Sequence, residues 1–165
     1  FYRQERVGRD RHTFQMIKFR TLESGAENKT GAMWSTALAS SHGRSYVTRV
    51  GRVLRTTSLD ELPQLWNVLK GEMSLIGPRP ERPVFVNQFI HEIYRYGDRM
   101  RVKAGMTGWA QVHGLKGDGG SLLERIEYDN YYIENWSLWL DVKVALLTVC
   151  RIWNDVFRRG TSRPT

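Results

Sequence analysis

The chain has 165 residues, the length of one domain, and 41% of them are hydrophobic, enough to fill a core. We therefore expect one catalytic or binding domain over residues 1–165. The formal net charge of +8 favours anionic partners, such as nucleic acid, phosphate-bearing metabolites or an anionic membrane surface. With one cysteine, Cys150, an internal disulfide and a cysteine-based metal site are excluded. The apolar neighbours of Cys150 predict that it is a small core residue. The most apolar stretch is 138–157, and charged residues interrupt it too often for a membrane span.

Residues 13–20 alternate between apolar and polar side chains, which predicts a β-strand. Lys18 and Arg20 are two residues apart, so they would project from one face of this strand. They form either a pair of cations at a binding site or an ordinary solvated strand edge. The polar stretch 24–44 predicts a long loop with a short helix at 33–38.

A helix is expected over residues 58–69. Ser58 and Glu61 match the capping box, in which the two side chains satisfy free amides at the helix start. Gly71 is expected to end this helix. Its buried face should be the apolar stripe at helical spacing, which consists of Leu62, Leu65, Trp66 and Leu69.

The adjacent carboxylates Asp60 and Glu61 are the main candidate site. A helix cap alone could explain them, because acidic residues are favoured in the first turn by the helix dipole. Three neighbours indicate phosphate binding instead: the free amides of the helix start, Arg55 upstream, and Arg79, which lies between two prolines. An arginine held stiffly loses little entropy when it binds phosphate. Near such cations and a metal ion, an ionised aspartate is a competent nucleophile toward phosphorus.

Helices are also expected at 84–94, 121–135 and 138–158, and a turn into a short strand within 102–114. The predicted fold class is therefore α+β, mostly helical, with a small β element. The last helix combines tryptophans with cations, which suits a helix lying on a membrane surface and equally one that packs on the core. These residues are Trp136, Trp139, Trp153, Lys143, Arg151, Arg158 and Arg159.

Five segments together resemble the bacterial sugar transferase family, the monotopic polyprenyl-phosphate phosphoglycosyl transferases. They are QERVG at 4–8, KFRT at 18–21, DELPQL at 60–65, GEMSLIGPRP at 71–80 and GMTGWAQ at 105–111, in the family's order over most of the chain. The resemblance implies a compact catalytic domain with amphipathic membrane-surface helices. The N-terminal re-entrant membrane helix of the family is expected to be missing from this chain.

The resemblance also implies a reaction and a place. The family transfers a sugar-1-phosphate from a UDP-sugar to undecaprenyl phosphate and releases UMP, at the cytoplasmic face of the bacterial inner membrane. This step initiates exopolysaccharide, capsule or glycan assembly. The stretch 128–141 looks like the exopolysaccharide branch, in which glucose-1-phosphate transferases are prominent, so glucose is the expected sugar.

The catalytic roles follow from the same resemblance. Asp60 is implied as the nucleophile that forms a phosphosugar-aspartyl intermediate. Glu61 is implied to hold Mg²⁺ together with Asp60, or to manage protons. The expected cofactor is therefore Mg²⁺.

Further residues match family positions near the substrate. Arg55 and Arg79 match phosphate-binding arginines, and Lys18 and Arg20 lie in a matching motif. Gln111 belongs to a segment implied to shape the nucleotide-sugar side of the site.

Two rival functions remain open at this point. A nucleic-acid-binding module explains the net charge but gives no reason for Asp60 and Glu61, which would repel a phosphate backbone without a metal. We therefore expect no nucleic-acid partner. A catalytically silent membrane scaffold of the same fold would keep the motifs without using them. The oligomeric state is left open.

Overall fold

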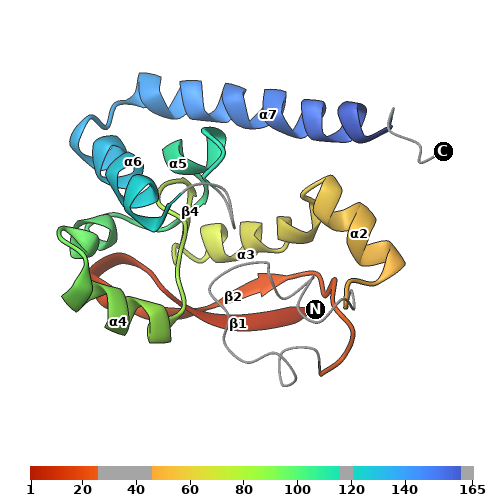
Figure 1. Cartoon of the computed structure of the whole chain (residues 1–165), viewed down its shortest axis with the longest axis horizontal. Coiled ribbons are helices and arrows are strands. Elements are labelled where there is room, and N and C mark those ends of the chain that lie inside the picture. The colour runs from red at the N-terminus through yellow and green to blue at the C-terminus, as the bar shows by residue number, and fades with distance from the viewer. Residues whose placement is uncertain (26–45, 116–120, 161–165) are drawn as a thin grey trace.

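The computed structural model describes residues 1–25, 46–115 and 121–160, and within them the chain adopts an α+β fold that is mostly helical (Figure 1). The strands are β1 (Tyr2–Val7), β2 (Thr13–Lys18), β3 (Ser74–Ile76) and β4 (Gly105–Thr107). The α-helices are α2 (Arg49–Thr56), α3 (Gln64–Leu69), α4 (Pro83–Glu92), α5 (Trp109–Val112), α6 (Leu122–Glu134) and α7 (Leu138–Gly160). The 3-10 helices are η1 (Arg9–Arg11), η4 (Leu59–Glu61) and η5 (Tyr96–Met100).

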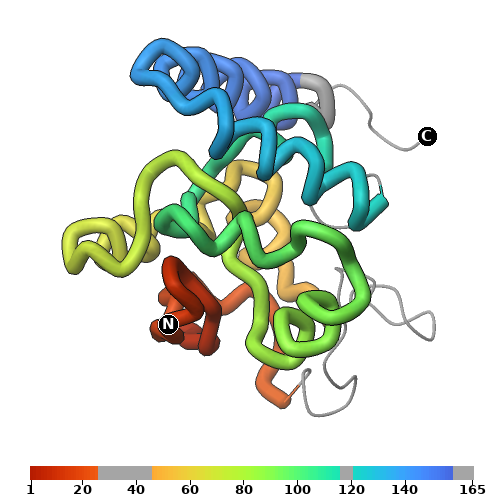
Figure 2. Tube along the Cα trace, turned by 90° about the vertical axis from the view of Figure 1, so that its left-hand side faces the viewer, coloured from red at the N-terminus to blue at the C-terminus, as the bar shows by residue number. Residues whose placement is uncertain are grey.

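The strands form two small sheets. β1 and β2 make an antiparallel hairpin, whereas β3 and β4 pair in parallel. An isolated bridge between Val7 and Glu81 ties the end of β1 to the segment that follows β3. The hairpin and α7 lie on opposite sides of the molecule, with α3 and the β3–β4 pair between them (Figures 1 and 2).

The buried core has two parts. One lies where β1, α4, η5 and α6 meet, and the other lies where β2 packs on the segment after α3. Their buried members are Val7, Val86, Tyr96, Met100 and Ile126 in the first and Phe14, Met16 and Met73 in the second. The second cluster includes two side chains of β2, so it fixes the strand that ends at Lys18.

Most element predictions agree with the structure. The strand expected at 13–20 is confirmed over 13–18, and α4, α6 and α7 confirm the three later helices. The short strand expected within 102–114 is β4, although the helix α5 after it was not predicted. The helix expected at 33–38 lies outside the described residues.

The helix expected over 58–69 is interrupted. Residues 59–61 form η4, and α3 begins only at Gln64, after Pro63. Ser58 has φ 56°, in the left-handed region, and its side chain makes no capping hydrogen bond. The predicted capping box is therefore wrong: the left-handed turn at Ser58 starts a separate short helix. Gly71 ends α3 with φ 77°, as predicted.

The apolar stripe of α3 is not buried, contrary to prediction. Leu62, Leu65, Trp66 and Leu69 are 46%, 42%, 56% and 78% exposed. The helix instead buries Gln64 and Asn67, each 1% exposed. The Asn67 amide accepts from Ile17 N at 3.1 Å and donates to Gln15 O at 2.8 Å, so it satisfies the free edge of β2. This pairing explains why the polar face of α3 turns inward.

The last helix, α7, also exposes much of its apolar surface. Val144 is fully buried, but Trp139 and Trp153 are 73% and 63% exposed, and so are many apolar neighbours along α7. Cys150 is also exposed, so its predicted place in the core is wrong. One face of this helix thus packs on the core, as the second alternative expects, and the other face is open. Its placement on a membrane surface stays a prediction. Within the described residues, no helix combines the length and hydropathy needed to cross a membrane.

Candidate functional site

Glu61 is the centre of the candidate site. Its Oε1 accepts hydrogen bonds from Lys18 Nζ and Arg79 Nη2, both at 3.0 Å. The three side chains come from η4, from the last residue of β2 and from the loop after β3. All three are largely buried, at 11%, 15% and 22% exposure for Glu61, Lys18 and Arg79. The fold therefore brings together three of the predicted site residues from distant parts of the sequence.

Burial and the shared carboxylate act differently on the two cations. Burial lowers the pKa of Lys18 to about 8, against the opposing effect of Glu61, and Arg79 lowers it further. Burial also acts to lower the pKa of Arg79, but the charge and hydrogen bond of Glu61 outweigh it and raise that pKa. Arg79 is thus a permanent charge, whereas Lys18 can exchange a proton near neutral pH.

Asp60 lies beside this group and is less buried than Glu61. Its carbonyl oxygen accepts from Phe19 N at 3.0 Å, which fixes η4 against the end of β2. Arg55, on α2, donates from Nε to Thr21 Oγ1 at 2.9 Å. Burial lowers the pKa of Arg55, and the charge of Asp60 opposes that shift. The charge of Asp60 also acts to raise the pKa of Arg79, so Asp60 interacts electrostatically with both arginines.

Arg20 and Gln111 occupy other places. Arg20 lies beyond the end of β2, is exposed, and donates to Ser24 Oγ at 3.1 Å. Gln111 is buried in α5, where Nε2 donates to Met106 O at 3.0 Å. The main-chain carbonyl oxygen of Gln111 accepts from Arg151 Nη1 at 2.7 Å, which ties α5 to α7. Both residues make structural contacts away from the Glu61 group.

The acidic pair can be tested for its fit to Mg²⁺. Among the described residues, no group of three or more histidine, cysteine, aspartate or glutamate side chains is placed to hold a metal ion. Asp60 and Glu61 are two carboxylates, and Oε1 of Glu61 already accepts from two cations. Mg²⁺ commonly binds through one or two carboxylates together with phosphate oxygens and water. The pair therefore fits a Mg²⁺ that is shared with a phosphate-bearing ligand.

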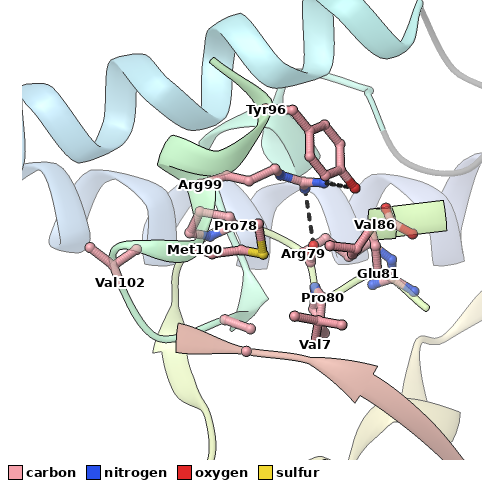
Figure 3. Close-up of a pocket in the computed structure, with 12 residues that line it drawn as sticks. Val7, Pro78, Arg79, Pro80, Glu81, Val86, Tyr96, Arg99, Met100 and Val102 are labelled. Atoms are coloured by element: carbon pink, nitrogen blue, oxygen red, sulfur yellow. Dashed lines mark hydrogen bonds between the residues drawn. The ribbon is translucent and has the colours of Figure 1, made fainter. Parts of the chain in front are cut away.

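A small cavity lies behind the loop that carries Arg79 (Figure 3). It is lined by this loop, the end of β1 and side chains of η5, including Tyr96 and Arg99. Its volume of about 20 Å³ has room for about one water molecule. Sites for small organic ligands are commonly larger by an order of magnitude. The cavity is therefore no substrate site.

Buried charges around this cavity were missed by the sequence reasoning. Arg99 Nη2 donates to Asp129 Oδ2 at 2.6 Å, and both side chains are at most 4% exposed. Glu81 lies 3.7 Å from Arg6 and 3.5 Å from Arg125. One signal was available: Asp129 lies three residues after Ile126 and three before Tyr132, in line with the buried face of α6.

Comparisons with known proteins point to one family. A profile of the bacterial sugar transferase family matches residues 1–155. An Aeromonas hydrophila protein named UDP-N-acetylgalactosamine-undecaprenyl-phosphate N-acetylgalactosaminephosphotransferase is 48% identical over 88% of this chain and 33% of its own length. Two proteins named UDP-glucose:undecaprenyl-phosphate glucose-1-phosphate transferase are also similar. That of Xanthomonas campestris pv. campestris is 41% identical over 92% of this chain and 31% of its own length. That of Caulobacter vibrioides is 42% identical over 90% and 54%.

The chain thus spans about a third to a half of the length of these relatives. The matching region includes every residue of the Glu61 group as well as Asp60 and Arg55. The chain belongs to the bacterial sugar transferase family.

Proposed function

We propose that this chain is the catalytic part of an enzyme that transfers a sugar-1-phosphate from a UDP-sugar to undecaprenyl phosphate and releases UMP. The observation that carries the proposal is the acidic pair set among cations, with Glu61 bonded to Lys18 and Arg79 and with Arg55 acting on Asp60. Such a site can hold a diphosphate while it presents a carboxylate to phosphorus. The names of the relatives support the same reaction class.

Asp60 is the proposed nucleophile. Its carboxylate oxygen attacks the phosphorus that carries the sugar, and a bond forms between them. The bond from that phosphorus to the bridging oxygen breaks, and UMP leaves with the electron pair. A phosphate oxygen of undecaprenyl phosphate then attacks the same phosphorus and releases Asp60 as a carboxylate. Asp60 suits this role because it is more open than Glu61.

Arg55, Arg79 and Lys18 neutralise the phosphate charge that repels the attacking carboxylate. Glu61 keeps two of these cations in place, so its first role is to orient them. Asp60 and Glu61 would hold Mg²⁺ when it binds with the substrate, and the ion would supply further neutralisation of the diphosphate.

The test is UMP release by the full-length protein with undecaprenyl phosphate, Mg²⁺ and each of several UDP-sugars in detergent. We propose glucose-1-phosphate as the transferred group, from the likeness of residues 128–141 to the exopolysaccharide branch. Relatives named for N-acetylgalactosamine and for galactose make those sugars the necessary comparisons. If none of the three UDP-sugars gave UMP, the proposed reaction would be overturned. A preference for another sugar would overturn only the assignment of glucose.

The rate should depend on the protonation of Lys18. Because burial lowers its pKa to about 8, Lys18 is charged below that pH and neutral above it. We expect kcat/KM to fall as pH rises above about 8, by up to about tenfold per unit. The same shift affects stability. Between about pH 8 and the higher pKa that Lys18 has in the unfolded chain, Lys18 is protonated in the unfolded state but neutral in the folded state. The free energy of unfolding therefore rises with pH through that range.

A Lys18→Arg variant separates this group from others that titrate in the same range. Its guanidinium stays charged, so the fall in kcat/KM should move to higher pH or disappear. An unchanged pH profile in this variant would show that another group controls the rate.

The open apolar faces of α3 and α7 are proposed to rest on the membrane surface, at the cytoplasmic face of the bacterial inner membrane. Leu65, Trp66 and Leu69 project from α3 and are 42–78% exposed. A membrane interface covers such side chains and attracts the net positive charge of the chain. The undecaprenyl phosphate substrate would lie in the same membrane.

Replacing Leu65, Trp66 and Leu69 by glutamine should lower the affinity of the 165-residue chain for anionic phospholipid vesicles by about tenfold or more. The melting temperature should not fall, because these side chains have little contact with the core. Vesicle sedimentation and thermal melting measure the two effects. Asn87→Ala/Gln88→Ala on the exposed face of α4 is the matched control. Unchanged vesicle affinity would exclude α3 from the membrane-binding surface.

A further inference from the structure

The loop that carries Arg79 is held by its carbonyl groups. Gly105 N donates to Pro78 O at 2.9 Å, and Val7 N donates to Glu81 O at 2.9 Å. Two of the four residues 78–81 are prolines, which have no amide hydrogen to donate. A regular ladder of hydrogen bonds is therefore impossible here, and the carbonyl bonds determine where the loop lies.

The two carbonyls in the middle of the loop accept from buried arginines. Arg99 Nη2 donates to Arg79 O at 3.0 Å, and Arg6 Nη1 donates to Pro80 O at 3.1 Å. Arg99 is 5% exposed. Every carbonyl of residues 78–81 thus accepts from outside the loop, and two of the donors, Arg6 and Val7, lie on β1. The charge-assisted hydrogen bonds are those to Arg79 O and Pro80 O.

Arg99 is itself fixed on several sides. The same Nη2 donates to Asp129 Oδ2 on α6 at 2.6 Å, and Nη1 donates to the Tyr96 hydroxyl at 3.4 Å. The Tyr96 ring lies 5.2 Å from the guanidinium carbon. Figure 3 shows Arg99 between the Tyr96 hydroxyl and the backbone of Arg79.

One path of contacts therefore leads from α6 to the acidic pair. Asp129 holds Arg99, Arg99 holds the carbonyl of Arg79, and the Arg79 side chain reaches Glu61. Stability alone gives a weak reason for a buried ion pair here, because a protein with apolar residues of similar volume in its place is often as stable or more stable. A donor aimed at the backbone of the phosphate-binding arginine is a function that apolar residues cannot replace.

We propose that Arg99, held by Asp129, is a positioning residue for the transfer reaction. It sets the main-chain orientation at Arg79 and thereby the place of the Arg79 guanidinium beside Asp60 and Glu61. The proposal rests on the proposed function of the site. Arg99 bonds to the main chain of Arg79, whose side chain reaches Glu61, so its effect on the acidic pair passes through Arg79.

The test replaces both partners in the full-length protein, as Arg99→Met/Asp129→Leu. Removing both charges leaves neither one buried without a partner, so the variant should fold. We expect kcat to fall by about 10- to 100-fold with KM changed less than about threefold, because a misplaced arginine loses transition-state contacts. If the double variant is unstable, Arg99→Lys keeps the charge pair and loses the planar two-way donation, and it should show a smaller fall in kcat.

The matched control is Arg95→Gln/Glu134→Gln. Arg95 and Glu134 form an exposed ion pair that also joins the η5 region to α6, but it does not contact the loop of Arg79. Its kcat should equal that of the wild type. An equal loss of kcat in this control and in Arg99→Met/Asp129→Leu would overturn the proposal, because any link between η5 and α6 would then suffice.

A second pair of measurements separates positioning from general damage. In an Arg79→Ala background, Arg99→Met/Asp129→Leu should lower kcat by no more than about twofold further, since the two act through one group. Equal losses in both backgrounds would overturn the proposal. Amide exchange at Val7 and Gly105, whose N–H groups donate to the carbonyls of Glu81 and Pro78, needs no activity: it should be faster in the variant than in wild type and in the control. If the wild type released no UMP, the proposed function would fail, and unchanged exchange would separately overturn the positioning role.

Discussion

Replacing Asp60 by asparagine is expected to lower UMP release by at least about 10³-fold, because an amide cannot attack phosphorus as a carboxylate does. Stability should change little, since Asp60 is only partly buried and its backbone bond to Phe19 N remains. Thermal melting and a UMP assay measure these effects. The full-length wild type incubated with UDP-sugar alone should gain the mass of a phosphosugar, and Asp60→Asn should not.

The control is Asp10→Asn, which removes an exposed carboxylate that pairs with its neighbour Arg9. It should retain full activity. If Asp60→Asn released UMP at the wild-type rate, Asp60 would not be the nucleophile. If neither Asp60→Asn nor the wild type released UMP, the result would favour the catalytically silent scaffold.

Local patterns predicted the helices α4, α6 and α7. The prediction for α3 was wrong for a physical reason: periodicity shows which face of a helix is apolar, but not what covers that face. Asn67 satisfies the edge of β2, so the amide face turned inward and the leucines turned outward. The same reason accounts for the exposed Cys150 on α7.

The contacts of the candidate site were only partly predictable. Ordered motifs indicated that Lys18, Glu61 and Arg79 share a site, and their shared hydrogen bonds agree with this. No local pattern indicates the left-handed turn at Ser58, because a residue other than glycine adopts it only when tertiary contacts hold it there. The pairing of Arg99 with Asp129 joins residues 30 apart, so it depends on how η5 packs on α6.

The second large effect is expected for Glu61→Gln. A neutral amide at this position cannot balance both Lys18 and Arg79, which are largely buried. Removing one partner of a buried ion pair typically costs about 3–5 kcal/mol. The loss here should be smaller, about 2 kcal/mol, because Lys18 can release its proton: its pKa is already lowered to about 8 by burial. The loss of stability should therefore be larger at pH 6 than at pH 8.5.

The loss of transition-state stabilisation should exceed the loss in the free energy of unfolding. Without Glu61, burial lowers the pKa of Lys18 further and Arg79 has lost its anchor. We therefore expect kcat/KM to fall by at least about 100-fold, or about 2.7 kcal/mol of transition-state stabilisation. Glu72→Gln is the matched control, because Glu72 is a nearby, half-buried carboxylate that accepts from Asn67 rather than from the two cations. It should lower kcat/KM by less than about threefold.

The combined variant Lys18→Met/Glu61→Gln separates the two roles of the acidic residue. It removes the buried ammonium together with its partner, so it should recover most of the stability that Glu61→Gln loses. It should not recover activity, because Lys18 no longer neutralises phosphate and Arg79 is still without its anionic partner. Urea unfolding and UMP release measure the two effects. A combined variant with wild-type activity would show that Glu61 and Lys18 serve the fold alone, and that Asp60 and the arginines suffice for transfer.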